Sequence, residues 1–474
     1  MGPGRDAGAI VAGGGMMKIL HVPFTFRPDP IGGTEVYVES LSAAQREIGL
    51  QPVIAAPSTR TESYTIEELA VHRFAVRDDV RDLRDLYGTG DPQAARQFGR
   101  ILDKEAPDVV HLHALTRGAS LSVVREASMR RIPSVFTYHT PTVSCPRGTL
   151  LRWGREPCDG CVDGVRCTEC RLESLGLNRL TSRVLARVPA PIGRTIADHG
   201  LSGGAWTALA MRELLRVRHE TFRACMAEVR HIVAVCEWAR AVLERNGVPR
   251  EKITVSRAGV PRQAAPAGRR RAGSGSRDVL RAAFLGRLDA TKGAQLVVKA
   301  IRSAPGLRMS LDVYGVVGSA ADGYRSQLIG AAAGDPRITF RDPVPSGTVV
   351  STLQQYDVAV VPSQWLETGP LVVLEAFAAG TPVIGSRLGG IAELVCHGVD
   401  GLLVPTGSVK AWRDVLERVD RDRELLARLR QGIRAPRWMM DAASDMMAVY
   451  NRVVDDRNEG FRGARSAHPL PSVH

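Results

Sequence analysis

The feature that most constrains the fold is a repeated alternation of short apolar runs with helix-like stretches. Residues 18–22, 108–113 and 134–139 are such runs, and segments with apolar residues at helical spacing lie between them. A strand that is apolar throughout is buried on both faces, and alternation with helices is typical of a parallel sheet covered on both sides. The sequence therefore predicts an α/β protein.

The alternation occurs twice along the 474 residues, which indicates two doubly wound domains. Between the two series lies a stretch at 261–278 that is rich in Pro, Gly, Ser and Arg. We interpret this stretch as a linker, and a long loop inside one domain is the alternative. The predicted parts are a disordered lead (1–15), an N-terminal domain (16–260), the linker (261–278), a C-terminal domain (279–432), a closing helix (433–454) and a disordered tail (455–474).

The charge balance favours an anionic partner. The chain has 63 Lys and Arg against 50 Asp and Glu, a formal net charge of +13. Aromatic residues make up only 5%, so a base-stacking surface and a nucleic-acid partner are not expected. The sequence has no long apolar run, and residues 1–15 do not resemble a secretory signal. A cytoplasmic location is expected, with contact at the inner face of the membrane as an option.

The most informative segment is 363–390, in which a predicted helix follows a buried strand. Pro370 is tolerated at the first helical turn and Gly380 just past the end, so the helix is expected at about Leu371 to Ala379. Its free backbone N–H groups and positive dipole end suit a diphosphate. Gly369 would let that ligand approach the backbone closely.

Two carboxylates and two cations accompany this helix start. Glu367 precedes the helix and Glu375 lies in its second turn, where both are suited to accept hydrogen bonds from sugar hydroxyls. Arg287 and Lys292 lie in one strand-to-helix loop of the same domain, suited to neutralise the charge of a departing nucleoside diphosphate. Taken singly, each of these residues is also explained as an ordinary surface charge. Together they predict a sugar-nucleotide site.

The segments 286–293 (GRLDATKG) and 367–375 (ETGPLVVLE) resemble the signature of glycosyltransferase family 4, including its Glu-x7-Glu spacing. The resemblance covers about 18–454, apart from an insertion in the middle. It implies the GT-B fold, in which two doubly wound Rossmann-like domains face each other across a cleft. It also implies that the C-terminal domain binds the nucleotide sugar and that the C-terminal helix packs back toward the N-terminal domain.

The same resemblance implies roles for single residues. Glu367 would hold the donor sugar and Glu375 the ribose, while Arg287 and Lys292 would grip the diphosphate. His139 stands where the family has its active-site histidine. The implied catalytic residues are His139, Glu367, Arg287 and Lys292. The implied donor-binding residues are Gly32, Gly33, Arg287, Lys292, Glu367, Thr368, Gly369, Leu371 and Glu375.

The sequence departs from the family pattern at two places. Thr140 follows His139 where the family often has aspartate, and Ala258 precedes Gly259 where the family has asparagine. Both positions leave the donor site intact, and the first bears on the acceptor side.

The implied activity is transfer of a hexose-type sugar from a UDP- or GDP-linked donor to an acceptor hydroxyl, with retention of anomeric configuration. The acceptor would be a glycan, a lipid-linked molecule or a small molecule, in synthesis of a cell-envelope polysaccharide or glycoconjugate. Because Arg287, Lys292 and the helix end handle the phosphate charge, catalysis requires no cofactor. The alternatives are a sugar-nucleotide epimerase or a phosphorylase of the same architecture, and a zinc-containing nucleic-acid-binding protein.

Five of the eight cysteines crowd into one segment: Cys145, Cys158, Cys161, Cys167 and Cys170. The two Cys-x2-Cys pairs, 158/161 and 167/170, offer four thiolates for a structural zinc ion, with free or redox-active thiols as the alternative. Some members of the resembling family carry a similar insertion. That resemblance favours Cys145, Cys158, Cys167 and Cys170 as ligands and leaves Cys161 as an alternative.

The stretch 177–196 mixes Arg with Leu, Val and Ile. It is suited to lie on an anionic membrane surface or to cover a lipid-linked acceptor. The alternative is an amphipathic lid packed on the N-terminal domain.

Overall fold

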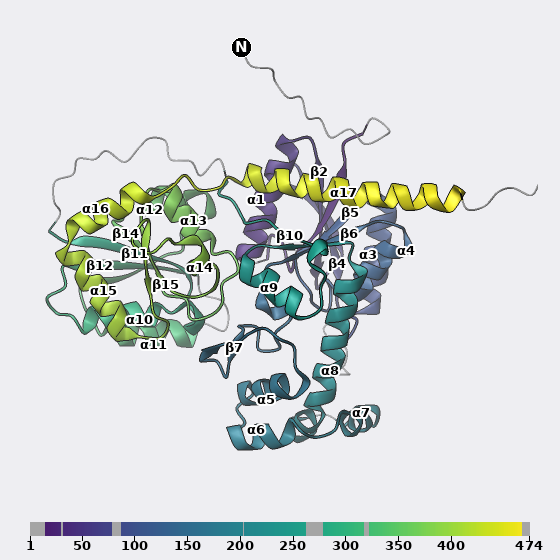
Figure 1. Ribbon diagram of the computed structural model, residues 1–474, viewed down its shortest axis with the longest axis horizontal. Coiled ribbons are helices and arrows are strands. Elements are labelled where there is room, and N and C mark those ends of the chain that lie inside the picture. Colours follow the sequence, from purple (N-terminus) through teal and green to yellow (C-terminus); the bar gives the residue numbers. More distant parts are fainter. Residues whose placement is uncertain are drawn as a thin grey trace, which may run out of the picture. The chain divides into compact units, whose positions relative to one another are not determined.

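The computed structural model describes residues 15–29, 32–77, 87–201, 203–261, 278–316 and 322–466. The chain divides into two compact units (Figure 1): unit 1 comprises Met1–Arg257 and Met440–His474, and unit 2 comprises Ala258–Met439. Unit 2 is therefore an insertion between two parts of unit 1. The predicted lead up to residue 14 and residues 262–277 of the predicted linker lie outside the described residues.

Unit 1 is built on an eight-stranded sheet in the order β10-β9-β6-β5-β1-β2-β4-β3. Neighbouring strands are parallel except for β3, which is antiparallel to β4. The strands are β1 (Lys18–Val22), β2 (Gln51–Ser58), β3 (Glu62–Ile66), β4 (Leu69–Ala75), β5 (Val109–Leu112), β6 (Ser134–Tyr138), β9 (His231–Ala234) and β10 (Ile253–Val255).

The two faces of this sheet differ because successive side chains of a strand point to opposite sides. Leu20, Leu112 and Phe136 belong to the main apolar core of the unit, which includes residues of α3, α4, α8 and α9. On the other face, His21 and His111 contact α1 and α17 through hydrogen bonds. These helices are α1 (Gly33–Glu47), α3 (Pro92–Glu105), α4 (Leu121–Met129), α8 (Gly204–Glu228), α9 (Glu237–Arg245) and α17 (Met439–Ser466).

The closing helix α17 packs on unit 1, as predicted, because its Tyr450 hydroxyl is bonded to side chains of α1 and β5. The disordered tail predicted from Asp455 is wrong as far as Ser466, since the helix continues to that residue. Val454 is buried and Asp456 pairs with Arg230 at 2.8 Å, so contacts with the unit extend past the predicted end. Residues 467–474 lie outside the described residues.

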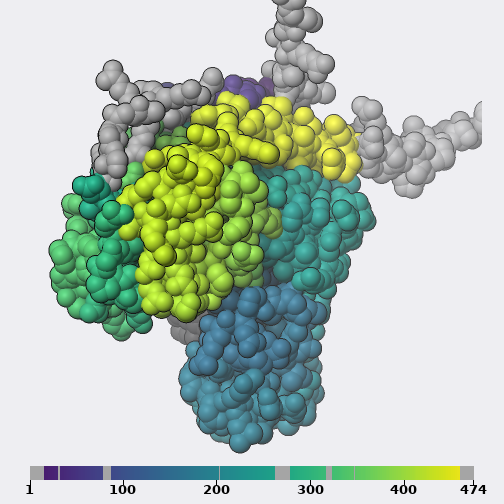
Figure 2. Space-filling model, turned by 60° about the vertical axis from the view of Figure 1, so that its left-hand side comes forward, coloured from purple at the N-terminus to yellow at the C-terminus, as the bar shows by residue number. Residues whose placement is uncertain are grey.

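A helical lobe leaves the sheet between β6 and β9. Its helices α5 (Gly164–Ser174), α6 (Arg179–Leu185) and α7 (Ala190–Asp198) lie beside the first part of α8 (Figure 1). The lobe is the blue projection in the lower part of Figure 2. It has a small apolar core of its own, made of Leu172, Ile196, Ala208, Ala210, Met211, Leu214 and Leu215.

Unit 2 is built on a six-stranded parallel sheet in the order β13-β12-β11-β14-β15-β16. The strands are β11 (Leu280–Arg287), β12 (Met309–Val316), β13 (Ile338–Arg341), β14 (Val358–Val361), β15 (Val383–Ser386) and β16 (Gly401–Val404). The helices of eight or more residues are α10 (Ala294–Arg302), α11 (Asp322–Ala332), α13 (Leu371–Ala378), α15 (Val409–Arg421) and α16 (Arg423–Gly432). The shorter ones are α12 (Val349–Leu353) and α14 (Gly389–Leu394).

Both sheets confirm the predicted α/β class with two doubly wound domains. The order in unit 2 places the first strand, β11, between β12 and β14, so the sheet grows outward from its centre in both directions. In unit 1, β1 lies between β2 and β5 in the same way. No described helix is long and apolar enough to cross a bilayer.

Candidate functional site

The candidate site of unit 2 lies where the strand order of its sheet reverses, between β11 and β14. The chain continues from β11 to β12 on one side and from β14 to β15 on the other, and open α/β sheets bind ligands beyond the carboxyl ends of the two strands at such a reversal. The loop after β11 carries Arg287 and Lys292, and the loop after β14 carries Glu367. The topology therefore brings together residues that are far apart in the sequence.

The loop after β11 is held by one capping residue and one glycine. The Asp289 carboxylate accepts hydrogen bonds from the backbone N–H groups of Thr291 (2.9 Å) and Lys292 (3.2 Å). Gly293 has a φ of +78°, and a Cβ there would lie 1.9 Å from the carbonyl oxygen of Pro362. Only glycine permits this approach of the loop to the end of β14.

Lys292 and Glu367 form a direct ion pair. The ammonium Nζ lies 2.6 Å from the carboxylate Oε1, and the Ser363 hydroxyl donates to the same oxygen at 2.8 Å. Lys292 also lies over the ring of Trp365, 5.3 Å from its centroid. Glu367 is buried, which makes this charge-assisted hydrogen bond stronger than an exposed one.

A pair of glycines holds the backbone that carries Glu367. The N–H of Gly390 donates to the carbonyl oxygen of Glu367 at 2.6 Å. A Cβ on Gly390 would lie 2.6 Å from the Thr368 oxygen, and Gly389 has a φ of +52°. Sequence reasoning gave no role to these glycines, although two adjacent glycines between a strand and a helix are a signal of close backbone approach.

Helix α13 begins at Leu371, as predicted, and ends one residue earlier than predicted, at Ala378. Pro370 caps it without a side-chain hydrogen bond, so the first-turn amides have no side-chain acceptor at the cap. Glu375 lies in the second turn, where burial raises the pKa of its carboxyl group to about 7. The helix start thus combines backbone donors with a carboxyl group that is poised to titrate near neutrality.

Arg287 ends β11, and its side chain is largely exposed. Its Nε lies 3.7 Å from the carboxylate of Asp289, a residue that also caps the loop. The guanidinium is therefore free to change rotamer at small cost in solvation, in contrast to the ion-paired Lys292.

The remaining predicted residues lie in unit 1. Gly32 caps α1, and its N–H donates to the Glu35 carboxylate at 2.9 Å, while Gly33 is the first residue of that helix. His139 follows β6, and its Nε2 lies 3.0 Å from Nδ1 of His113.

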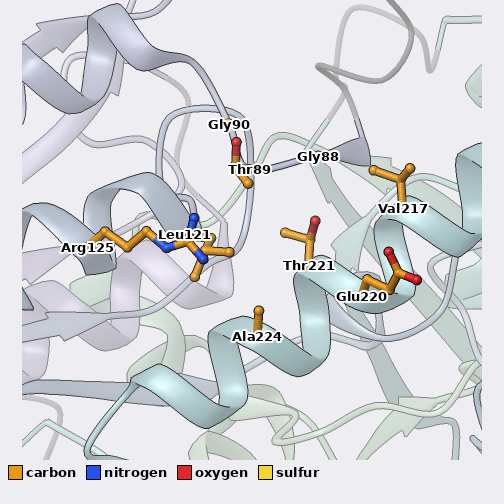
Figure 3. Close-up of a pocket in the computed structure, with 9 residues that line it drawn as sticks. All are labelled: Gly88, Thr89, Gly90, Leu121, Arg125, Val217, Glu220, Thr221 and Ala224. Atoms are coloured by element: carbon orange, nitrogen blue, oxygen red, sulfur yellow. The ribbon is translucent and has the colours of Figure 1, made fainter. Parts of the chain in front are cut away.

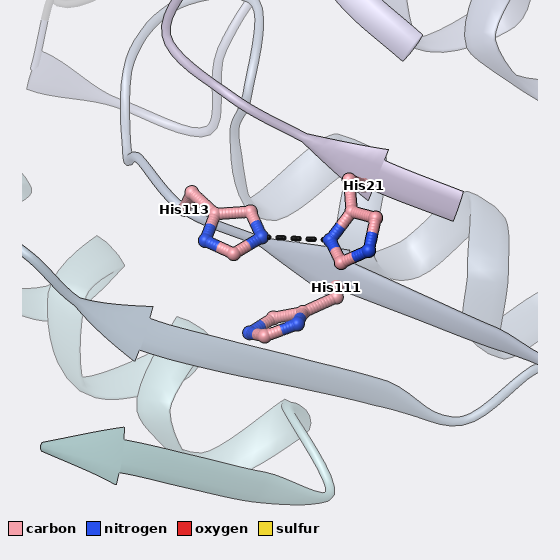
Figure 4. A group of neighbouring side chains, drawn as sticks. All are labelled: His21, His111 and His113. Atoms are coloured by element: carbon pink, nitrogen blue, oxygen red, sulfur yellow. Dashed lines mark hydrogen bonds between the residues drawn. The ribbon is translucent and has the colours of Figure 1, made fainter. Parts of the chain in front are cut away.

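Sequence reasoning missed the histidines that surround His139. His21, His111 and His113 bring their ring nitrogens within 4.8 Å of one another (Figure 4). A signal was available, because His111 and His113 are two positions apart on a predicted strand and so share a face.

The five cysteines between positions 145 and 170 are free thiols in the lobe and in the segment that leads to it from β6. Cys167 and Cys170 lie one helical turn apart on α5. Burial, and to a smaller extent the nearby thiols of Cys145 and Cys158, raises the pKa of the Cys167 thiol to about 12. Among the described residues, however, none of these five thiols belongs to a group of three metal-ligating side chains whose ligand atoms lie within 4.8 Å of one another.

A separate hollow of about 440 Å³ lies between α4 and α8 in unit 1 (Figure 3). Its lining includes the side chains of Leu121, Arg125, Glu220 and Thr221. Arg125 is already paired with Glu228 at 2.8 Å, and none of the predicted site residues lines this hollow. We assign it no role in the chemistry.

Two doubly wound units built on parallel sheets are the two halves of the GT-B architecture. Profiles of known families match both halves. Residues 32–259 match the Glycosyl transferase 4-like domain, and residues 271–435 match the Glycosyl transferases group 1. The chain belongs to glycosyltransferase family 4.

Similar proteins include the D-inositol 3-phosphate glycosyltransferase of Arthrobacter sp. (strain FB24), 38% identical over 28% of this chain and 32% of that protein. The chain spans about a third to a half of the length of the curated relatives it matches. Among solved structures, sucrose-phosphate synthase from Thermosynechococcus elongatus matches with a TM-score of 0.61 at 17% identity, over 95% of this chain and 100% of that chain.

Anabaena HepE in complex with UDP-glucose matches with a TM-score of 0.56 at 15% identity, over 94% of this chain and 100% of that chain. At such identities the solved structures establish the shared fold.

The raised pKa of Glu375 predicts a pH-dependent stability. Because the folded-state pKa (about 7) lies above that of an unfolded glutamate, its contribution to stability is full below about pH 4.3 and is lost as the pH rises through 7. We expect Glu375→Gln to raise the free energy of unfolding at pH 8 by about 1–2 kcal/mol, less than the full shift because the side chain is partly exposed. Urea denaturation between pH 5 and 8 measures the difference.

Glu424→Gln serves as the matched control, since its side chain is 91% exposed. This change is expected to alter stability by less than about 0.5 kcal/mol. A stability difference between Glu375→Gln and the parent that stays constant from pH 5 to 8 would contradict the assignment.

Proposed function

We propose that this chain transfers a hexose-type sugar from a nucleoside-diphosphate sugar to an acceptor hydroxyl with retention of anomeric configuration. The observation that carries the proposal is the pairing of Lys292 with Glu367 at the start of α13, beyond the carboxyl ends of β11 and β14. This is the place where open α/β sheets bind ligands, and it joins an anion-binding helix start to a buried carboxylate.

The donor diphosphate would occupy the first turn of α13. Backbone N–H groups of this turn have no side-chain acceptor at the cap, and Gly369 gives the phosphates access to the backbone. Lys292 would supply a fixed positive charge, because Trp365 and Glu367 hold its ammonium group. Arg287 would supply a second positive charge, because its exposed side chain can change rotamer and contact the phosphates.

The two glutamates would accept hydrogen bonds from different hydroxyl groups of the donor. Glu367 is fixed by Ser363 and Lys292 in the loop before the helix, so it suits the transferred sugar. Glu375 lies one turn into α13 and suits the ribose. A ribose hydroxyl donating to Glu375 would favour the ionised carboxylate and so lower its raised pKa on binding.

In the reaction the bond between the anomeric carbon and the diphosphate oxygen breaks, and a bond to the acceptor oxygen forms on the same face of the sugar. The proton of the acceptor hydroxyl leaves with the diphosphate, whose charge Lys292, Arg287 and the helix start stabilise. The residues of this chain act by positioning and by electrostatic stabilisation of the leaving group. His139 would have the role of the family's active-site histidine, as the resemblance implies.

The comparisons support a nucleotide-sugar donor, because the similar HepE was solved with UDP-glucose. The nucleotides named in the similar solved structures are UDP and ADP, so a GDP-linked sugar stays a prediction from the sequence alone. The relatives named for D-inositol 3-phosphate make a small phosphorylated acceptor one candidate, beside a glycan or a lipid-linked molecule of the cell envelope. The net charge of +13 is compatible with each of these anionic or membrane-linked acceptors.

We further propose a structural zinc ion in the lobe, held by Cys145, Cys158, Cys167 and Cys170. The thiols of Cys145, Cys158 and Cys167 are close enough to influence one another electrostatically, and Cys170 is one turn from Cys167. Four thiols in a small loop-and-helix region are the donor set that zinc prefers. The ion would tie the loop after His139 to α5.

The lobe also suits an anionic membrane surface. It exposes a set of large apolar side chains: Leu175, Leu180, Val184, Ile192, Leu201 and Trp206. Residues 175–206 carry four arginines and a single acidic residue, Asp198. Exposed apolar side chains among basic ones are typical of segments that lie on anionic lipid headgroups. We propose that the lobe places the enzyme at such a surface, beside a lipid-linked acceptor.

The donor site predicts nucleotide-dependent stabilisation. In a thermal-shift panel of UDP, GDP, ADP and TDP sugars, we expect one nucleotide at about 100 times its Kd to stabilise the protein by roughly 2.7 kcal/mol. Arg287→Ala should weaken binding about tenfold because a phosphate contact is lost, and Glu367→Ala should lower turnover more than affinity. Lys410→Ala, on an exposed face of α15, is the control. The proposal fails if no sugar nucleotide binds, or if Arg287→Ala binds like the parent.

The zinc proposal predicts metal in the purified protein. Mass-spectrometric elemental analysis should find about one zinc per chain, and Cys158→Ser with Cys167→Ser should remove it because two of four ligands are lost. Cys225→Ser, at a buried cysteine in α8, is the control that should keep the metal. Protein that is active and free of zinc after purification without chelators would refute the proposal.

The membrane proposal predicts binding that depends on lipid charge. The protein should co-sediment with vesicles that contain phosphatidylglycerol and much less with pure phosphatidylcholine vesicles. Leu180→Asp with Val184→Asp should weaken binding at least roughly tenfold, because apolar contact is lost and negative charge is added. Met129→Asp, at an exposed methionine of α4 outside the lobe, should leave it unchanged. Equal binding to both vesicle types would count against the surface.

A further inference from the structure

Four histidines of unit 1 lie on the sheet face opposite the main apolar core. His21 is on β1, His111 is on β5, His113 follows β5 and His139 follows β6. The parallel register pairs His21 with His111 directly, so their side chains lie next to each other on the same face. Figure 4 shows the rings of His21, His111 and His113 converging.

Three of these histidines and one glutamine form a continuous hydrogen-bonded row. Oε1 of Gln45 lies 2.8 Å from Nε2 of His21. Nδ1 of His21 lies 2.9 Å from Nε2 of His113, and Nδ1 of His113 lies 3.0 Å from Nε2 of His139. Gln45, His21 and His113 are buried, and His139 is partly exposed. This histidine row (Gln45, His21, His113 and His139) therefore runs from the interior of unit 1 to its surface.

The rings of the row are neutral. Burial lowers the pKa of His21 to about 4 and that of His139 to about 3, and it holds the pKa of His113 well below its usual value. A neutral imidazole has one N–H donor and one acceptor nitrogen. In a row of neutral rings, the direction of one hydrogen bond therefore fixes the direction of every other.

The inner end of the row sets that direction. The amide Nε2 of Gln45 donates to the hydroxyl of Tyr450 at 3.1 Å, so its carbonyl oxygen faces His21 and can only accept. The Tyr450 hydroxyl can then donate to Nδ1 of His111 at 2.7 Å. Nε2 of His111 in turn donates to the hydroxyl of Thr137 at 2.7 Å. In this arrangement every donor meets an acceptor.

From these directions we infer that Gln45, His21 and His113 are positioning residues that hold His139 in one tautomer, with its proton on Nε2 and its lone pair on Nδ1. His21 donates from Nε2 to Gln45, His113 donates from Nε2 to His21, and His139 donates from Nε2 to His113. Tyr37, whose ring meets that of His139 edge-on at 4.8 Å between centroids, restricts the ring orientation.

The consequence for catalysis rests on the proposed function. If His139 contacts the transferred sugar through its imidazole ring, the ring does so as a neutral acceptor through Nδ1, toward a hydroxyl that donates. It is not available as a protonated general acid, because burial lowers the pKa of His139 to about 3 and so keeps its ring neutral. The row thus determines the kind of hydrogen bond that His139 can offer.

A metal ion among His21, His111 and His113 is the competing interpretation, since their nitrogens lie within 4.8 Å of one another. An ion bound there would need the lone pairs of all three rings. Nδ1 of His21 and Nε2 of His113 are already hydrogen-bonded to each other at 2.9 Å. Both nitrogens of His111 also have hydrogen-bond partners. The geometry therefore favours the hydrogen-bonded row.

The tautomers can be observed directly in the full-length protein. Two-bond ¹H–¹⁵N spectra of protein labelled with ¹⁵N-histidine distinguish a protonated from an unprotonated ring nitrogen, and His139→Gln assigns the signals of His139. The expected result for the parent protein is a proton on Nε2 of His139. A proton on Nδ1 of His139, or histidine signals that change on removal of a bound transition metal, would overturn the inference.

Paired variants test whether the row imposes that tautomer. His113→Leu removes the acceptor for the Nε2–H group of His139, so His139 should become a mixture of tautomers. His113→Asn places an amide oxygen near the position of the His113 Nδ1 atom, so His139 should keep its proton on Nε2. Gln45→Leu is a second, independent break at the inner end. His231→Asn, at a buried histidine of β9 bonded to Thr254, is the control that should change nothing at His139. An unchanged tautomer in both His113→Leu and Gln45→Leu would refute the inference.

Kinetics give a separate readout once a donor is identified. His113→Leu should lower kcat at least roughly tenfold with little change in donor Kd, and His113→Asn should recover most of the loss. An equal loss of kcat in His113→Leu and His113→Asn would contradict the role of the acceptor atom. Because the spectra need no substrate, failure to find a donor would refute the proposed function and leave the tautomer result standing.

Discussion

The structure depends on the parallel pairing of the first strand of each unit with the strand that begins the second half of its sheet. In unit 2, pairing of β11 with β14 brings the loop that carries Lys292 against the loop that carries Glu367. In unit 1, pairing of β1 with β5 sets His21 beside His111. Parallel register fixes which side chains share a face and which loops emerge together, so a slip of β1 by one residue would move His21 to the opposite face of the sheet.

Much of the region around the start of α13 was predictable because its determinants are local. The start of α13 follows from Pro370, and the need for open backbone follows from Gly369, so the helix could be placed within one residue at each end. The direct ion pair between Lys292 and Glu367 was not predicted, because it joins positions 75 residues apart and depends on the register of two strands. Sequence reasoning assigned both residues to one site but gave them separate roles.

The parts that sequence reasoning missed are those with partners distant in sequence. Gln45 and Tyr450 lie 405 positions apart, and no local pattern links a glutamine inside an amphipathic helix to a tyrosine in another. The sequence predicted a disordered tail from Asp455, whereas the contact of Asp456 with Arg230 lies on a helix that continues to Ser466. From sequence alone, a polar residue on an amphipathic helix is expected to face solvent. Gln45 instead faces a polar side chain of the sheet, His21, and only the structure shows this.

The insertion of unit 2 between the two parts of unit 1 has a consequence for biosynthesis. The strands of unit 1 leave the ribosome first, yet the tyrosine that anchors Gln45 and His111 is translated only after the whole of unit 2. Unit 2, which is continuous in the chain, can fold as soon as it has emerged. In unit 1, the sheet face that carries the histidines lacks its contact with α17 until then, so a nascent chain that stops before α17 would contain a complete unit 2 and an unfinished unit 1.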